Sequence, residues 1–281
     1  NNACRLVIHV ENEEDGAATV SSALEDCQQL RSLFCLKAVA GFWEPQMLWP
    51  QGVVVKNCKS LRVLKFEGFD FDGKKLPIQL PNLVHLRLLS LKFCKLDELP
   101  SAVADLPLLQ TLDLEVKNKI KIPNVLWKMK RLKHLFLSFK HSTMDEGGKL
   151  QLHGLSELET LWALDSKTDE IADLLHLENL RLIYAEVNDD ESLQILMNRI
   201  SMNCPNLREL DLFICDCNFI SSEQGHVLLE EVLLCKCLQS LYFEAQLNQV
   251  PKYDPFLQSL VALRLTDNYM EEDPMETLAQ L

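Results

Sequence analysis

Residues 86–96, LRLLSLKFCKL, contain the pattern from which the fold of this 281-residue chain can be predicted. Leucine occupies the first, fourth and sixth positions of the stretch, cysteine the ninth, and leucine again the eleventh. With substitutions, the spacing Leu-x-x-Leu-x-Leu recurs about eleven times along the chain. Successive units begin between 22 residues apart (Leu158 to Leu180) and 31 residues apart (Leu30 to Leu61). Self-similarity at this period indicates a repeat architecture.

The leucine spacing predicts one short extended strand in each repeat. Side chains of a strand point alternately to opposite faces, so the fourth and sixth positions share one face and the third and fifth share the other. A single short strand cannot bury its leucines alone, whereas stacked neighbours share a continuous core. The predicted fold is therefore an α/β leucine-rich-repeat solenoid, or horseshoe, with a parallel sheet on its concave side and irregular or helical segments on its convex side.

Composition limits the classes of protein that fit. The chain is 47% hydrophobic and 25% charged, has no run of 18 apolar residues, and carries a formal net charge of −13. No membrane span is expected, and the acidic balance argues against binding nucleic acid, whose phosphates require basic groups. No linker or low-complexity tract interrupts the repeats, so residues 1–281 are expected to form one domain. The start at Asn1 and the end within a patterned stretch suggest a fragment of a longer protein.

The ten cysteines are explained mainly by their positions in the repeat. Cys94 and Cys215 stand at the ninth position, where cysteine or asparagine turns inward and bonds backbone groups at the bend. Four others precede the first leucine of a repeat by three residues: Cys27, Cys58, Cys204 and Cys235. Small buried thiols need neither a metal nor an oxidising compartment, and the pairs Cys215/Cys217 and Cys235/Cys237 lack the usual zinc-ligand spacing. We therefore expect free thiols, no bound metal and no disulfide framework.

No motif in the sequence carries chemistry. Gly147, Gly148 and Lys149 lack the spacing and the hydroxyl of a phosphate-binding loop. A serine nucleophile elbow and a His-Glu-x-x-His metal motif are also absent from the sequence. We expect no catalytic, cofactor-binding or metal-ligating residues, so the chain is predicted not to be an enzyme and neither to bind nor to hydrolyse ATP.

Longer repeats contain extra material outside the strands. Residues 189–202 show helical spacing with acids in the first turn, which suits a helix N-terminus. Ser221 and Gln224 fit a capping box ahead of a second helical segment, residues 227–234. The proline-bounded insert at residues 41–52 contains Trp43 and Trp49. Packing as a convex-side helix or cap is favoured for this insert over an exposed binding patch.

The third and fifth positions of the repeats should face solvent across the sheet. About twenty side chains would line this face, which matches the roughly 20–30 residues per side of a standard protein interface. Aromatic residues are enriched at interface hot spots, and three of them fall on consecutive strands at the fifth position. The alternative is that these rings cover one another or pack against another domain of the same protein. The expected partner-binding residues are Phe136, Trp162, Tyr184, Asp211, Tyr242 and Arg264.

Four segments resemble a known family. Residues 96–114, LDELPSAVADLPLLQTLDL, and residues 122–135, IPNVLWKMKRLKHL, closely resemble the repeats of plant intracellular nucleotide-binding leucine-rich-repeat disease-resistance proteins. Residues 4–9, CRLVIH, are similar to the strand with which that repeat domain begins, and residues 273–281 are similar to a lead-in to a further repeat. The resemblance spans the chain and points to the coiled-coil class of these receptors.

The resemblance implies a cytoplasmic ligand-sensing and autoinhibitory domain of a plant immune receptor. Such domains recognise a pathogen effector, or a host protein altered by one, and hold the receptor's own nucleotide-binding module inactive until then. ATP or ADP is implied only for that module, which is missing here. The alternative is a generic cytosolic leucine-rich-repeat adaptor, such as the substrate-recognition arm of a ubiquitin ligase.

Overall fold

The computed structural model describes residues 4–11, 20–21, 24, 28–37, 46–50, 53–56, 58–72, 76–138, 140–144, 148–215, 217, 223–233, 235–245 and 259–266. The chain divides into two compact units, Asn1–Leu150 and Gln151–Leu281, which are called unit 1 and unit 2 below. The expectation of a single domain over residues 1–281 stays a prediction.

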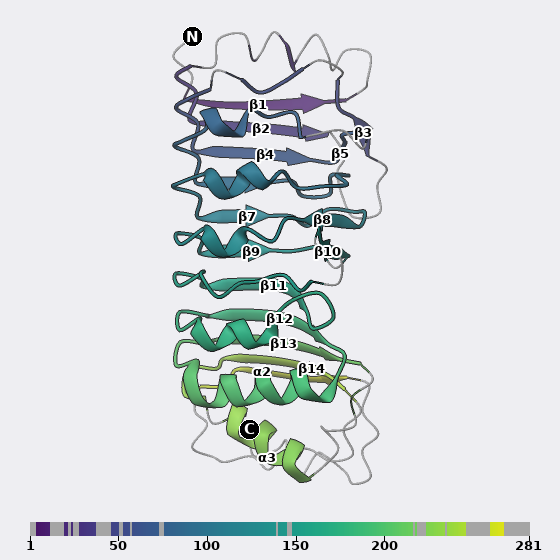
Figure 1. Ribbon diagram of the computed structural model, residues 1–281, viewed down its shortest axis with the longest axis vertical. Coiled ribbons are helices and arrows are strands. Elements are labelled where there is room, and N and C mark those ends of the chain that lie inside the picture. The colour runs from purple at the N-terminus through teal and green to yellow at the C-terminus, as the bar shows by residue number, and fades with distance from the viewer. Residues whose placement is uncertain are drawn as a thin grey trace. The chain divides into compact units, whose positions relative to one another are not determined.

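Unit 1 is built on a parallel sheet, whose strands appear stacked in Figure 1. Its strands, in spatial order, are β1 (Arg5–Val10), β2 (Ser32–Lys37), β4 (Val63–Glu67), β6 (Leu88–Ser90), β7 (Thr111–Asp113) and β9 (His134–Phe136). Two small parallel pairs lie beside it: β3 (Met47–Leu48) with β5 (Phe69–Asp70), and β8 (Ile120–Ile122) with β10 (His141–Thr143). Three 3-10 turns complete the unit: η1 (Leu80–Asn82), η2 (Ser101–Asp105) and η3 (Leu126–Lys128).

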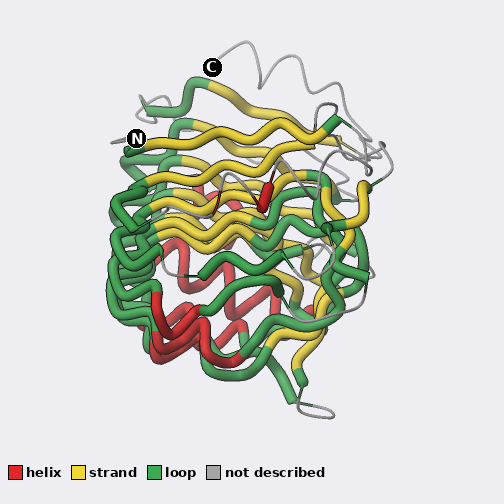
Figure 2. Tube along the Cα trace, turned by 90° about the horizontal axis from the view of Figure 1, so that it is seen from above, coloured by secondary structure: helices red, strands yellow, loops and turns green. Residues whose placement is uncertain are grey.

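Unit 2 has the same plan with longer connections. Its parallel strands are β11 (Thr160–Asp165), β12 (Leu182–Val187), β13 (Glu209–Ile214), β14 (Ser240–Glu244) and β15 (Ala262–Thr266). Its helical elements are η4 (Ile171–His176), α2 (Asp190–Asn203) and α3 (Glu223–Leu233). In each unit the strands gather on one side and the helical turns on the opposite side, as Figure 2 shows.

The strand registers confirm the repeat pattern read from the leucines. Neighbouring strands pair residues at the same repeat position, as in Leu89 with Leu112 and Leu112 with Leu135. Each of these three leucines is 0% exposed. Burial of a leucine side chain stabilises a fold by roughly 1.5–3 kcal/mol, so a column of them accounts for the stacking of the repeats. The leucine-rich-repeat solenoid predicted from the sequence is the fold observed.

One register departs from the pattern, in β11. Leu161 pairs with Ile183, but Leu164 rather than Ala163 pairs with Ala185, so one extra residue is accommodated between them. Ala163 takes a left-handed conformation with φ of 61° and is 3% exposed. Counting from Leu158 in the sequence predicts Ala163 at the sixth position, paired with Ala185, and this prediction is wrong. A β-bulge adds one residue to one strand only, and spacing alone does not reveal it.

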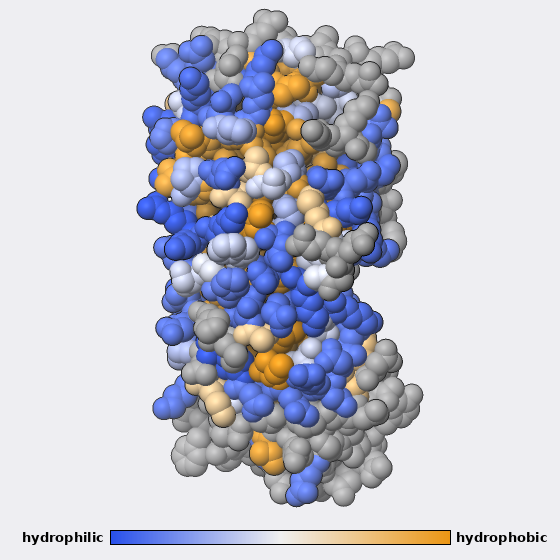
Figure 3. Space-filling view, viewed as in Figure 1, coloured by the Kyte–Doolittle hydropathy of each residue, from blue (hydrophilic) through white to orange (hydrophobic). Residues whose placement is uncertain are grey.

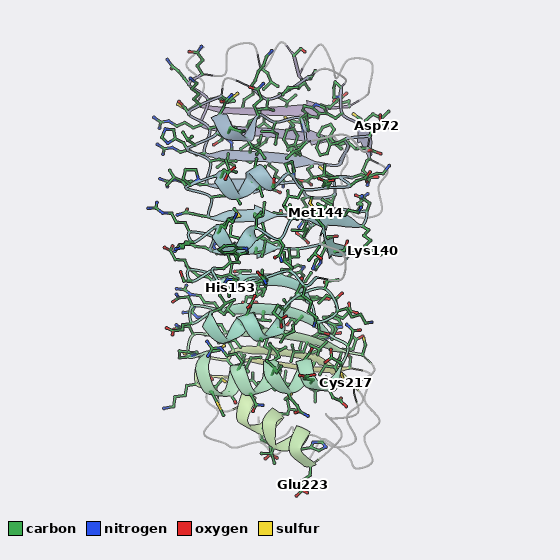
Figure 4. The ribbon with its side chains drawn as sticks, in the orientation of Figure 1. Asp72, Lys140, Met144, His153, Cys217 and Glu223 are labelled. Carbon is green, nitrogen blue, oxygen red and sulfur yellow. The ribbon has the colours of Figure 1, made fainter. Side chains whose placement is uncertain are left out.

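Both predicted helices are present. Helix α2 begins after Asp189, whose side chain accepts a 2.7 Å hydrogen bond from the backbone N–H of Ser192. Acidic residues Asp190 and Glu191 occupy its first turn, where their negative charges interact favourably with the positive end of the helix dipole. Helix α3 begins at Glu223, which is labelled in Figure 4. Ser221 and the side chain of Gln224, the expected capping box, lie outside the described residues.

Trp49 is packed inside unit 1. It is 8% exposed, its Nε1 donates a 2.8 Å hydrogen bond to the Val53 carbonyl, and its ring lies 4.9 Å from that of Phe66. Rings of Phe69 and Phe71 lie 5.1 and 6.2 Å away. This half of the insert packs in the interior as predicted, although Trp49 directly follows a strand, β3, rather than belonging to a helix. Trp43 lies outside the described residues.

The cysteine positions are partly confirmed. Cys94 is fully buried, as expected of a ninth position that turns inward. Burial raises the pKa of the Cys94 thiol to about 12, and burial likewise raises the pKa of Cys35 to about 12. Both thiols therefore stay protonated and inert at neutral pH.

Two expectations about cysteines are wrong. Cys215, predicted to turn inward at the ninth position of its repeat, is exposed. Strand β13 runs to Ile214, so Cys215 directly follows the end of the strand instead of lying in an inward bend. Cys217, labelled in Figure 4, carries a half-buried thiol that donates to the Cys215 carbonyl at 3.2 Å. Cys58 is disulfide-bonded, with its partner outside the described residues.

The disulfide at Cys58 has a geometric reason. Equivalent positions of stacked repeats lie about 4.8 Å apart, which is within the Cα–Cα range of disulfides. Two cysteines at the same position of successive repeats can therefore be joined. The remaining cysteines of the described residues are thiols. Within that part of the chain, no group of three His, Cys, Asp or Glu side chains is arranged to hold a metal ion.

Candidate protein-binding surface

The exposed face of the unit 2 sheet is formed by alternate residues of five strands. These residues are half-buried or exposed, whereas the positions between them, such as Leu161, Ile183 and Leu210, are at most 1% exposed. Strand pairing arranges all of these residues except Trp162 in three rows, and Trp162 joins the second row through its ring contact with Tyr184. The first row is Thr160, Leu182, Glu209, Ser240 and Ala262; the second is Trp162, Tyr184, Asp211, Tyr242 and Arg264; the third is Asp165, Glu186, Phe213, Glu244 and Thr266.

Four aromatic rings, here named the aromatic ladder, cross this face: Trp162, Tyr184, Phe213 and Tyr242. Trp162 stacks on Tyr184 with ring centroids 4.3 Å apart and planes at 27°. Phe213 lies 4.7 Å from Tyr184 and 5.1 Å from Tyr242. Aromatic pairs at these separations contribute about 0.5–1.5 kcal/mol each beyond the area they bury. The four rings therefore form one continuous aromatic surface rather than a set of isolated side chains.

The ladder ends at an arginine. The guanidinium carbon of Arg264 lies 5.1 Å from the Tyr242 ring centroid, within the range of a cation–π contact. The Tyr242 hydroxyl donates a 2.5 Å hydrogen bond to Glu244 Oε2, and Thr266 Oγ1 donates to that carboxylate at 3.3 Å. The ring of Tyr242 on β14 thus contacts the Arg264 guanidinium of β15 through its face and the Glu244 carboxylate of β14 through its hydroxyl.

Carboxylates surround the ladder. Asp165, Glu186, Glu209, Asp211 and Glu244 lie on the fifteen-residue face, against one base, Arg264. Burial, and then the neighbouring charge of Glu209, raises the pKa of Asp211 above its usual range. Burial, and then the charges of Asp211, Glu186 and Glu244, raises the pKa of Tyr184 to about 12. Negative charge therefore accumulates where water is partly excluded.

Unit 1 balances the charges on its exposed sheet face. Lys65 Nζ lies 2.5 Å from Glu67 Oε2, and Lys92 Nζ lies 2.7 Å from Glu115 Oε2. The Ser90 hydroxyl donates to Asp113 at 2.7 Å. Each of these acids has a donor on its own strand or on a neighbouring segment. The acidic face of unit 2 differs from that of unit 1 because it lacks such internal lysines.

The residues expected to bind a partner are placed as the pattern predicted. Strand pairing joins Tyr184 to Asp211, Asp211 to Tyr242 and Tyr242 to Arg264, all at the fifth position. Trp162 joins them through its ring contact with Tyr184. Phe136 occupies the fifth position of β9 in unit 1, where it pairs with Asp113. Its membership of the ladder stays a prediction, as does the partner-binding role of all six residues.

Phe213 was missed by the sequence reading. It stands at the seventh position, two residues beyond Asp211, where the strand continues its alternation through Ile214. The ladder therefore steps from the fifth position on β12 to the seventh on β13 and back to the fifth on β14. The signal that could have located Phe213 is the segment ELDLFI, residues 209–214. Its apolar residues continue beyond the sixth position of the repeat, which indicates a strand that extends past the consensus pattern.

Trp162 has an unusual polar atom. Its Nε1 is buried and has no hydrogen-bond partner within the described part of the chain. An unpaired buried donor costs about 1–3 kcal/mol. Such a group in a native structure calls for an explanation, such as a functional role or a bound water molecule.

The opposite face of unit 2 carries its helical elements (Figure 1). Figure 3 shows the helix-bearing face, where mostly hydrophilic side chains surround a small hydrophobic area. No helix in the described ranges combines the length and apolar character needed to cross a membrane.

Parallel strands in repeat register, with buried leucines on one face and an open aromatic surface on the other, define a leucine-rich-repeat protein. The chain belongs to the family described as "Leucine-rich repeat region", whose profile matches residues 29–281. In a solved structure, the internalin inlF of Listeria monocytogenes aligns with 99% of this chain and 85% of its own, with a TM-score of 0.57 at 18% identity. That similarity shows the fold alone.

The curated relatives are plant proteins. Disease resistance protein RPP8 of Arabidopsis thaliana is 32% identical over 230 residues, which is 81% of this chain and 25% of that protein. Probable disease resistance protein RXW24L of the same plant is 33% identical over 231 residues, or 82% of this chain and 25% of that protein. The chain thus spans about a quarter of the length of these relatives. It is a leucine-rich-repeat region related to those of plant disease resistance proteins.

Proposed function

We propose that the chain is the ligand-sensing and autoinhibitory repeat domain of a cytoplasmic plant immune receptor. Its partner is a pathogen effector, or a host protein that an effector has altered, bound through protein–protein contacts. In the receptor, the domain also restrains the receptor's own nucleotide-binding module. The function is recognition rather than catalysis.

The aromatic ladder is the observation that carries this proposal. Aromatic rings are over-represented among the few residues that dominate binding energy at protein interfaces. Four contacting rings on one open sheet face provide such a group. The face spans five strands at about 4.8 Å spacing, which suits a folded protein or extended segment better than a metabolite, whose sites are concave and enclose most of the ligand. The names of the relatives support placing that recognition in disease resistance.

Substitution in the receptor that contains this chain tests the proposal. Trp162→Ala removes one end of the ladder, and Trp127→Ala is the matched control, because Trp127 lies on η3 on the helical side of unit 1. The readout is the cell-death response of leaf tissue to the pathogen strain that activates the unchanged receptor. Trp162→Ala should abolish the response, whereas Trp127→Ala should retain it at equal protein levels.

The response of Trp162→Ala decides the outcome. A hot-spot tryptophan costs at least about 2 kcal/mol of binding, or about thirtyfold in affinity. A Trp162→Ala receptor that accumulates normally and still responds fully would refute recognition by this face.

A further inference from the structure

We propose that the exposed sheet face of unit 2 binds a cationic segment of its protein partner, whose arginine or lysine side chains lie over the aromatic ladder between the carboxylates. This inference rests on the proposed function and adds the chemistry of the partner.

Unpaired acidic charge is the first reason. Glu186, Glu209 and Asp211 have no ion pair with any described residue. In unit 1, Glu67 and Glu115 of the corresponding face are paired with lysines at 2.5 and 2.7 Å. Carboxylates held together without counter-charges repel one another, and partial burial increases that repulsion because the effective dielectric is lower. A cationic partner would remove it.

The protein itself supplies an example of the expected contact. Arg264 lies over Tyr242, while Glu244 accepts the hydroxyl of that same ring. In unit 1, Arg5 lies 4.8 Å from the centroid of Phe34, at the start of the sheet. The geometry of these sheets therefore accommodates a guanidinium over a ring at the fifth position. Trp162 and Phe213 present the same kind of ring with no cation over it among the described residues.

Rings and acids alternate at a spacing suited to arginine. Phe213 is paired across the strands with Glu186 on one side and Glu244 on the other. Asp211 is paired with Tyr184 and Tyr242. A guanidinium that stacks on a ring can at the same time donate its in-plane N–H groups to a carboxylate on the neighbouring strand. A face that offers both ring surfaces and carboxylates therefore favours an arginine-containing segment over a purely hydrophobic one. It repels acidic segments.

The donor of Trp162 adds a second, independent feature. Its buried Nε1 lacks an acceptor among the described residues. Protein segments offer backbone carbonyl groups along their whole length. A segment that repositions the indole as it binds can satisfy this group, which a partner made only of cationic side chains cannot do. This feature favours a polypeptide occupant, in agreement with the proposed function.

Titration of the 281-residue chain with defined peptides tests the inference. The probe is a capped twelve-residue peptide of Gly-Arg-Ser repeats, and the comparison peptide carries citrulline, a neutral isostere, at every arginine. Calorimetry should detect binding of the arginine peptide and at least tenfold weaker binding of the citrulline peptide. Binding of the arginine peptide should also weaken as salt rises, because exposed charges are screened.

A pair of charge-matched double variants separates the face from the overall acidity of the chain. Glu186→Gln/Asp211→Asn neutralises two acids of the face, whereas Glu157→Gln/Glu178→Gln neutralises two exposed acids in the turns before β11 and β12. The first pair should weaken arginine-peptide binding at least tenfold and the second less than twofold. Equal losses for the two pairs would show attraction to net charge alone and overturn the inference. In the unchanged chain, equal binding of the arginine and citrulline peptides, or no binding of either, would also overturn the inference. This second comparison does not depend on the folding of any variant.

Failure here is distinguishable from failure of the proposed function. If Trp162→Ala abolishes the receptor response but the arginine peptide does not bind, the recognition function stands and the cationic partner is refuted. If Trp162→Ala leaves the response intact while the arginine peptide binds as expected, the face binds cationic segments but is not the sensing surface.

Discussion

Leu161 and Trp162 are consecutive residues of β11 with opposite structural roles, and their alanine variants should differ in stability. Leu161 is 0% exposed in the column of buried leucines. Its truncation leaves a cavity, and changes of this kind cost roughly 2–5 kcal/mol. With a urea dependence of about 1–3 kcal/mol per molar, the unfolding midpoint should fall by roughly 1 M or more.

Trp162→Ala removes two opposing contributions. Loss of the stacking contact with Tyr184 destabilises by about 0.5–1.5 kcal/mol. Loss of the unpaired buried Nε1 donor removes a cost of about 1–3 kcal/mol. The loss of hydrophobic burial by this half-buried side chain adds to the first contribution, and the second offsets both. The variant should therefore unfold within about 1 kcal/mol of the parent, typical of surface positions.

Urea unfolding followed by far-ultraviolet circular dichroism measures both variants. Tryptophan fluorescence is unsuitable, because Trp162→Ala removes one of the four tryptophans and so changes the signal itself. Equal loss of stability in the two variants would refute the assignment of Leu161 to the core and Trp162 to the exposed face. A parent-like Leu161→Ala would refute the account of the leucine column.

Further predictions concern thiols and one carboxylate. In the native protein at pH 8, Cys35 and Cys94 should not react with a thiol reagent, since burial raises the pKa of each thiol to about 12, whereas exposed Cys237 should react at once. Unfolding without reductant should reveal eight thiols, and reduction should raise the count to ten, because Cys58 is disulfide-bonded; ten without reductant would contradict that bond. Asp211→Asn should raise the urea midpoint at pH 7, because the raised pKa of Asp211 means that folding opposes its ionisation. This gain should disappear as the pH falls through the folded-state pKa, where the parent carboxyl becomes protonated; a gain that grows on acidification would contradict the sign.

Most of the fold was predictable because the spacing of leucines within each repeat matches the alternation of side chains along a strand. The pairing of Leu89, Leu112 and Leu135, and the fifth-position row of unit 2, follow directly from counting. The same counting located the helix that starts after Asp189, since a cap and two acids mark its beginning.

The remaining features depend on contacts between repeats that spacing does not encode. The bulge at Ala163 adds a residue to one strand without altering the leucine count around it. Phe213 joins the ladder only because β13 continues past its consensus length. The bond at Cys58 depends on the three-dimensional position of a second cysteine rather than on any local pattern. The pairing of acids with lysines in unit 1 and not in unit 2 likewise appears only once side chains are placed.

Alternation along each strand separates two sets of residues that evolve under different constraints. Positions such as Leu210 and Leu241 cannot change without loss of packing, whereas Asp211 and Tyr242 beside them contact other side chains of the exposed face and solvent. Each strand contributes its own few exposed side chains, so one strand's contribution can be exchanged while the others are kept. A protein facing partners that change over generations could in this way acquire a new specificity one strand at a time, on a scaffold whose stability is nearly unaffected.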